Sequence, residues 1–169
     1  MGWTFGYETD RKRFIERITS KSHFSDGYTP LEYRVVGNHV WQLVLKNSTG
    51  DKFITLALIA KQRNGGWGYK GLSEDMGPYY YDCPLSLLKK ATAPLNKYAA
   101  DWRDKVREYH AEKAQRRQLK PGAVFTLGNT QYRIERRHAN PRMGWLIRRL
   151  SDGIEFRISN RSIAKAVFT

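Results

Sequence analysis

Five side chains capable of chemistry fall in one short segment of this sequence, residues 65–84. They are Lys70, Glu74, Asp75, Asp82 and Cys83. Carboxylates can bind a divalent cation that activates water for phosphodiester cleavage, and a Cys can act as a nucleophile when a base assists it. His23 or His39 could supply that base if the fold brings one of them near. A metal-dependent hydrolase or nuclease is therefore one function open to this segment.

Simpler roles account for the same residues. Glu74 and Asp75 are adjacent, so their side chains diverge in an extended chain, and no spacing here matches a metal-binding or nuclease signature. Asp82 precedes Pro84 by two residues, where a helix N-cap belongs. A lone Cys beside a helix start is usually a small buried hydrophobe. We expect no metal and no cofactor, and our leading interpretation assigns no catalytic residue.

The same segment is rich in aromatic residues. Gly and Pro punctuate it between an apolar strand pattern and a helical pattern, which predicts a loop. Three consecutive tyrosines cannot all be buried on one face of a regular element, so at least one should be exposed beside Trp67 or Tyr69, for stacking or protein binding. Alternatively, Gly77-Pro78 turns the chain so that all three rings fill the junction between sheet and helices. The predicted binding residues are Trp67, Tyr69, Lys70, Tyr79, Tyr80 and Tyr81.

The charge of the chain is strongly positive. It carries 30 basic and 16 acidic residues, a formal net charge of +14, of which residues 103–169 contribute +10. Such a field attracts polyanions, and Arg donates bidentate hydrogen bonds to phosphate groups. We therefore predict nucleic-acid contacts from Arg103, Arg107, Arg116, Arg117, Arg133, Arg136, Arg137, Arg142, Arg148, Arg149, Arg157 and Arg161.

Composition excludes several classes of protein. A single Cys allows no internal disulfide and no cysteine-based zinc site. No apolar run approaches the roughly 20 residues that span a bilayer. The N-terminus lacks the basic-then-apolar order of a signal peptide. We expect a cytoplasmic protein without a membrane partner.

Local patterns predict the elements that position these residues. A short helix is expected over Asp10 to Ser20. Three strands should follow, with Gly37-Asn38 as the hairpin turn between the first two. Antiparallel pairing of neighbouring strands predicts a three-stranded meander, covered by the helix on one face. The strands are Leu31 to Val36, Val40 to Lys46 and Phe53 to Ala60.

The second half of the chain changes from helical to strand-like patterning. Helices are expected over Pro84 to Ala91 and over 97–118, the latter with Tyr98, Trp102, Val106 and Tyr109 on its buried side. Trp102 and Val106 should pack against Tyr33, Trp41, Leu43, Phe53, Leu56 and Leu58. Lys120-Pro121-Gly122 ends the helical part, and several short strands follow it. We predict an α+β fold with an α+β domain over 1–118 and a small Arg-rich SH3-like β-barrel over 120–169.

Several motifs resemble those of a known family. They are Gly68-Tyr69-Lys70, the stretch Ser73 to Pro78, Asp82-Cys83-Pro84 and the stretch Tyr98 to Arg103. The chain resembles a family of bacterial proteins of unassigned activity carried by chromosomes, plasmids and phages. In that family the loop more often has Asp-Met where this sequence has Gly71-Leu72, which removes one acid from any three-carboxylate metal site. The resemblance implies a shared fold and a mobile-element setting.

Three functions compete. The leading one is a non-enzymatic, basic binding protein that engages nucleic acid or a nucleoprotein and modulates host defence from a phage or plasmid. The second is the metal-dependent hydrolase or nuclease of segment 70–82. The third is a protein-interaction module, or inhibitor, that uses the exposed aromatic loop against a host defence protein. The sequence predicts no oligomeric state.

Overall fold

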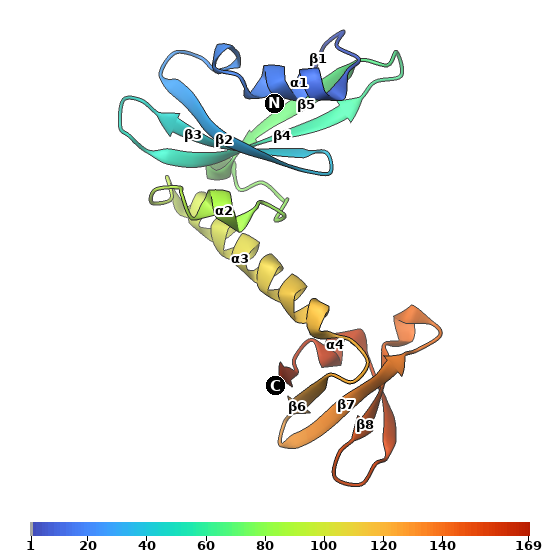
Figure 1. The fold of residues 1–169 in the computed structure, drawn as a ribbon. Helices are drawn as coiled ribbons and strands as arrows, with labels where there is room; N and C mark the ends of the chain where they lie inside the picture. Colours follow the sequence, from blue (N-terminus) through green and yellow to red (C-terminus); the bar gives the residue numbers. More distant parts are fainter. Residues whose placement is uncertain (1) are drawn as a thin grey trace. The chain divides into compact units, whose positions relative to one another are not determined.

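The computed structural model describes residues 2–169 and contains two compact units, Met1–Tyr109 and His110–Thr169 (Figure 1). The fold is α+β, as predicted, with one antiparallel sheet in each unit. The unit boundary falls inside helix α3 (Lys97–Gln118), before the composition break at residues 120–122. Beyond this boundary, Gln115 of α3 donates hydrogen bonds to the carbonyls of Ala164 and Ala166, at 2.7 and 3.0 Å.

The sheet of the first unit has five strands in the order β1-β5-β4-β3-β2. The two predicted hairpins are present, because β3 pairs with β2 on one side and with β4 on the other. Gly37 makes the turn between β2 and β3 with a positive φ of 57°. The sheet is larger than the predicted three-stranded meander because β5 and β1 extend it. Its strands are β1 (Thr4–Phe5), β2 (Tyr28–Val36), β3 (His39–Lys46), β4 (Lys52–Lys61) and β5 (Trp67–Ser73).

Strand β5 corrects the prediction of a loop over 65–84. Trp67 and Tyr69 alternate with Gly68 and Lys70, which is a strand period of two, and the register pairs the whole of β5 with β4. The glycines concealed this pattern because glycine is usually rare in strands. Only the remainder of the segment is irregular, apart from the 3₁₀ helix η2 (Glu74–Met76).

Each face of this sheet has its own hydrophobic cluster. Helix α1 (Arg11–Thr19) packs Phe14, Ile15 and Ile18 on one face, where Val40 and Ile59 meet them. Asp10 caps this helix by accepting a hydrogen bond from the Arg13 amide. The 3₁₀ helix η1 (Lys21–His23) follows α1 on that side.

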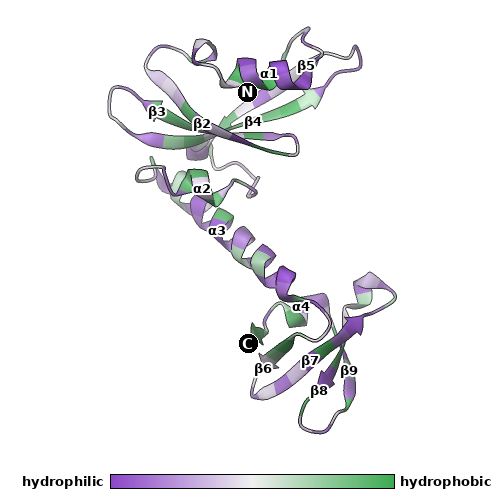
Figure 2. Ribbon diagram, in the orientation of Figure 1, coloured by the Kyte–Doolittle hydropathy of each residue, from purple (hydrophilic) through white to green (hydrophobic). Residues whose placement is uncertain are grey.

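The opposite face of the sheet lies against α2 (Leu85–Leu88) and the first turns of α3 (Figure 1). Trp41, Leu43 and Leu56 pack there with Trp102 and Val106, as predicted. Strand β4 supplies buried residues to both faces and is strongly hydrophobic (Figure 2).

Two details of the predicted packing are wrong. Phe53 belongs to the α1 face, because its register partner is Val44, and Tyr33 is exposed on edge strand β2. On α3 the buried side runs through Ala99, Trp102, Arg103 and Val106, a spacing of three and four residues. Tyr98, predicted on the buried side, is 69% exposed.

The second unit contains five strands in the order β10-β6-β7-β8-β9. Its core consists of Phe125, Ile134, Ile147, Ile158 and Ile163, with Trp145 beside them. Strands β9 and β10 are the two edges of this sheet, so hydrogen bonds do not close it into a barrel. The elements are β6 (Val124–Leu127), β7 (Thr130–Arg137), η3 (Pro141–Met143), β8 (Trp145–Arg149), β9 (Glu155–Ile158), α4 (Asn160–Ile163) and β10 (Val167–Phe168).

Among residues 2–169, no helix combines the length and the hydropathy that crossing a membrane requires.

Candidate nucleic-acid interface

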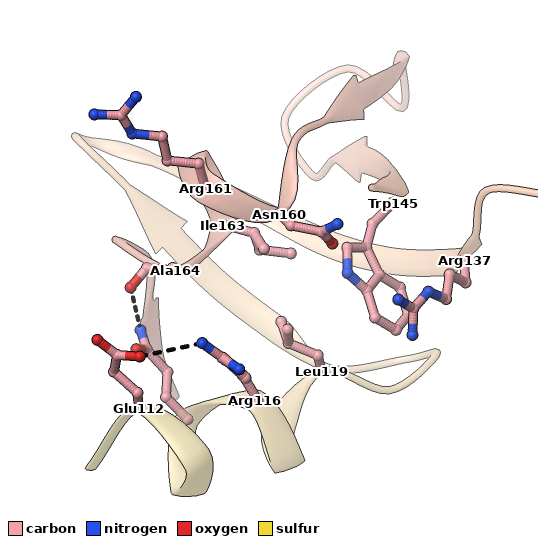
Figure 3. A pocket seen from close by; sticks show the side chains of 10 residues that line it. Glu112, Arg116, Leu119, Arg137, Trp145, Asn160, Arg161, Ile163 and Ala164 are labelled. Carbon is pink, nitrogen blue, oxygen red and sulfur yellow. Dashed lines mark hydrogen bonds and ion pairs between the residues drawn. The ribbon is translucent and has the colours of Figure 1, made fainter. Parts of the chain in front are cut away.

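A cavity of about 720 Å³ lies in the second unit, between the last turns of α3 and the elements β7, β8 and α4 (Figure 3). We call it the arginine groove. Three arginines from three separate elements line it: Arg116 on α3, Arg137 on β7 and Arg161 on α4. All three belong to the set predicted from sequence, but nothing local in the sequence brings them together. The other lining residues are Glu112, Gln115, Leu119, Trp145, Asn160, Ile163 and Ala164.

The arginines differ in how they are held. Arg137 is the register partner of Trp145, and its guanidinium carbon lies 5.3 Å from the centroid of the indole ring. Arg116 forms an ion pair of 3.1 Å with Glu112 one turn earlier, and both side chains are exposed. Within residues 2–169, neither Arg137 nor Arg161 pairs with a carboxylate. Two cationic groups are thus open to an incoming anion.

Trp145 adds a neutral donor to the groove. The residue is 7% exposed, and its Nε1 group has no hydrogen-bond partner among the described residues. A buried donor without an acceptor costs free energy, so a group that accepts from it at the groove would be stabilising. A phosphate oxygen is such an acceptor.

Other predicted arginines of this unit are occupied by acidic neighbours. Arg133 and Arg148 share Glu135 at 3.0 and 3.2 Å, and Arg148 also reaches Glu155 at 2.8 Å. Arg149 donates to both carboxylate oxygens of Asp152, at 3.0 and 2.5 Å. These hydrogen bonds lower the pKa of Asp152 and raise that of Arg149. The carboxylates therefore neutralise part of the positive charge that these three arginines could offer to a phosphate.

The remaining predicted arginines have no common site. Arg107 pairs with Asp104 at 2.6 Å on α3, and Arg157 lies 4.0 Å from the sulfur of Met143. Arg117, Arg136 and Arg142 pair with no carboxylate within residues 2–169. They stay available as additional phosphate contacts.

Arg103 was predicted to contact nucleic acid, and this prediction is wrong because the residue is buried. Its Nε and Nη2 atoms donate to the two carboxylate oxygens of Glu74 at 2.8 and 2.6 Å, and its Nη1 donates to the carbonyl of Thr92 at 2.5 Å. The Arg103 and Glu74 side chains are 5% and 0% exposed. The pair joins α3 to the end of β5, so Arg103 cannot reach a phosphate and Glu74 cannot act as an exposed catalytic carboxylate. The predicted buried side with Tyr98, Trp102, Val106 and Tyr109 would leave Arg103 exposed, whereas the observed buried side includes it.

Of the two histidines considered as a base, the fold brings His39 to a carboxylate of the 70–82 segment, whereas His23 packs against Tyr69 on the other face of the sheet. The Nδ1 atom of His39 lies 2.8 Å from both carboxylate oxygens of Asp82, and the Tyr80 ring lies edge-on to the imidazole at 4.7 Å. Asp82 is therefore not the N-cap predicted for the next helix, whose cap position is Pro84 without a side-chain hydrogen bond. Lys70 lies on the same sheet face as His39, because both are opposite Leu58.

The other candidate catalytic groups are dispersed or inert. Cys83 is buried, and burial, with smaller contributions from Glu74 and Asp82, raises the pKa of its thiol far above the usual range. A thiol kept protonated in this way is a poor nucleophile. Asp75 has one buried carboxylate oxygen without a hydrogen-bond partner in the described chain. Among residues 2–169 there is no group of three His, Cys, Asp or Glu side chains that could hold a metal ion.

The six predicted aromatic-loop residues do not form one surface. Trp67 and Tyr69 pack against Phe14 of α1, with ring centroids 6.5 and 6.4 Å apart, whereas Lys70 is on the opposite face of β5. Tyr81 packs against the core under α3. Tyr79 is 88% exposed and Tyr80 is partly exposed, which confirms that at least one of the three tyrosines is accessible. The Tyr80 ring, however, lies against His39, on the sheet face opposite to Trp67 and Tyr69.

Comparisons with protein-family models, with curated proteins and with solved structures find no match to this chain.

Proposed function

We propose that this protein binds nucleic acid through the arginine groove, with the phosphate backbone as the ligand. The observation that carries the proposal is the convergence of Arg116, Arg137 and Arg161 on one cavity beside an unpartnered Trp145 donor. Guanidinium groups bind phosphates in bidentate geometry, and three cations on three elements suit a chain of phosphates. Contacts of this kind position a nucleic acid without reading its sequence.

The charge of the second unit supports the same proposal. Residues 110–169 carry 13 basic and 4 acidic side chains, a net of +9 in 60 residues. We further propose that this unit is SH3-like in topology. Its support is the strand order, in which the last strand pairs with the first, and the one-turn helix α4 that precedes this last strand.

The test compares two triple variants of equal charge. In the groove variant, Arg116, Arg137 and Arg161 become Gln; in the control, the carboxylate-paired Arg133, Arg148 and Arg149 become Gln. We expect the groove variant to lose most of its affinity for a mixed-sequence oligonucleotide. The slope of log K against log salt should also become shallower, by about 0.9 for each lost phosphate contact on duplex DNA. The control variant should retain most of the affinity and most of the salt dependence.

Two results would contradict the proposal. One is an equal loss in the two variants, which would mean that net charge alone attracts the nucleic acid. The other is native protein that binds neither DNA nor RNA at low salt. Melting curves of both variants separate loss of binding from loss of folding.

A second candidate function, hydrolysis, is favoured by the contact between His39 and Asp82. A carboxylate that orients an imidazole is the arrangement of a general base, here next to Tyr80 and on the face that carries Lys70. Asp82→Asn should abolish any cleavage of DNA or RNA in Mg²⁺, whereas Asp101→Asn on the exposed side of α3 should not. Cleavage that persists in Asp82→Asn would exclude this site.

The resemblance noted in the sequence leads us to propose a mobile-element setting, in which binding of nucleic acid or a nucleoprotein modulates host defence. Its test is the genomic neighbourhood of the coding sequence.

A further inference from the structure

A second cavity, of about 500 Å³, lies in the first unit on the α1 face of the sheet. Strands β3, β4 and β5 make its floor, and the chain after η1 makes one side. We call it the sheet pocket. Although the protein carries a net charge of +14, no Lys, Arg, Asp or Glu lines this pocket. Its chemistry therefore differs from that of the arginine groove and does not suit a phosphate.

Polar side chains cross the pocket floor in a row. Gln42 of β3 is opposite Thr55 of β4, and Thr55 is opposite Ser73 of β5, so the three side chains share one face. Gln42 is 4% exposed, and its Oε1 has no hydrogen-bond partner among the described residues. The same holds for Oγ1 of Thr55. A buried polar group without a hydrogen-bond partner costs free energy, so a ligand that hydrogen-bonds to Gln42 or Thr55 gains affinity.

Small residues make the hollow above this row. Ala57 and Gly71 are directly opposite each other on β4 and β5. Gly71 does not have a positive φ, and a Cβ built on it would meet only a ring carbon of Tyr69, at 3.9 Å. Neither the backbone nor the neighbours of Gly71 require glycine. The absence of a side chain there leaves space in the pocket.

Aromatic rings form the rim. The His23 ring is edge-on to Tyr69, with centroids 5.0 Å apart, and edge-on to Phe24 at 6.0 Å. Partial burial, and then the charge of Arg17, lower the pKa of His23, which keeps the imidazole neutral at neutral pH. The rim is therefore as uncharged as the floor.

We propose that the sheet pocket binds an uncharged, planar heteroaromatic ring that carries both hydrogen-bond donors and acceptors, the chemistry of a nucleobase. The amide of Gln42 can pair with two atoms on the edge of such a ring, as amide side chains do with adenine. Aromatic side chains at the rim provide stacking surfaces, and the volume is in the range of small-ligand sites. The ring can belong to a free nucleoside or to an unpaired base of a strand.

Two variants of the full chain test this site. Gly71→Val fills the pocket with a residue that favours strands, and Gln42→Leu removes the unmatched amide while nearly keeping its volume. The four common ribonucleosides are titrated and followed by calorimetry and by amide NMR shifts of the lining residues. We expect at least one nucleoside to bind, with at least tenfold weaker binding in each variant. The melting temperature of each variant should equal or exceed that of the native protein.

Three outcomes would overturn the proposal. The first is that no nucleoside and no short single strand shifts the resonances of the lining residues. The second is unchanged binding in Gly71→Val, and the third is a lower melting temperature of Gln42→Leu together with unchanged binding. Binding of a short strand alone, lost in Gly71→Val, would support the site and identify an unpaired base as the source. The groove variant with Gln at 116, 137 and 161 should keep its nucleoside affinity, so failure of one proposal does not imply failure of the other.

Discussion

Arg103 and Glu74 form a doubly hydrogen-bonded ion pair that solvent barely reaches. Removing one partner leaves the other charge buried and unmatched, which typically costs about 3–5 kcal/mol. We expect Arg103→Met to lower the free energy of unfolding, measured by urea denaturation, by this amount. The double variant Arg103→Met/Glu74→Leu should recover much of the loss, because no charge stays behind.

The exposed pair Lys97–Asp101 on the same helix is the control. Lys97→Met should leave the free energy of unfolding nearly unchanged, because solvent screens an exposed ion pair. If Arg103→Met lowered the free energy of unfolding as little as Lys97→Met does, the buried pair would contribute no more than a surface contact.

Cys83 offers a chemical measure of the same interior. Because burial raises its pKa, the thiol stays protonated in the folded protein even in mildly alkaline solution. We expect iodoacetamide at pH 8.5 to alkylate Cys83 at least a hundredfold more slowly in native protein than in urea. Mass spectrometry measures both rates. Rapid native alkylation would reopen the possibility of a nucleophilic cysteine.

At the scale of elements, helix α3 is held to the first sheet by Trp102. Its ring packs on Trp41 with centroids 5.7 Å apart, and its Nε1 donates to the carbonyl of Tyr80 at 2.9 Å. Truncation of a large core residue costs about 3–5 kcal/mol, which we expect for Trp102→Ala in chemical denaturation. Tyr98→Ala, four residues earlier on the exposed side, should cost far less. Equal losses would contradict the assigned buried side of α3.

The turn before β8 requires glycine for two reasons. Gly144 has a φ of 88°, and a Cβ at this position would lie 2.0 Å from the carbonyl oxygen of Ile158. Gly153 also has a positive φ, of 72°, but open space around it, so a Cβ there would meet no neighbouring atom. Gly153→Ala should cost about 1–2 kcal/mol, the penalty of a left-handed conformation. Gly144→Ala should cost clearly more and disturb the NMR signals of β8 and β9, and equal costs would show that the contact with Ile158 relaxes readily.

At the scale of the whole molecule, the placement of charge can be separated from its amount. We compare the groove variant with a variant in which Lys12, Lys61 and Lys89, all exposed in the first unit, become Gln. Both lose three charges. We expect the groove variant to elute from immobilised single-stranded DNA at clearly lower salt. Equal elution would indicate that the overall charge of +14 accounts for retention.

The sequence by itself determined the features that depend on near neighbours. The turn at Gly37, the strands on either side of it and the long helix 97–118 follow from short-range periodicity and turn chemistry. The excess of positive charge in the second half was likewise visible without a structure. The family resemblance and the mobile-element setting stay predictions.

Only the tertiary structure decided which distant residues meet. Arg103 joins Glu74, His39 joins Asp82, and Arg116, Arg137 and Arg161 share a cavity, although each set is spread widely along the chain. Such contacts depend on strand register and on which side of a helix faces the sheet. A shift of one residue in a strand would move every side chain to the other face. A residue's own neighbours in sequence encode that choice only in part. Folding placed three of the twelve predicted arginines in a groove, four others in surface ion pairs and one in a buried pair, and left four without a carboxylate partner among residues 2–169.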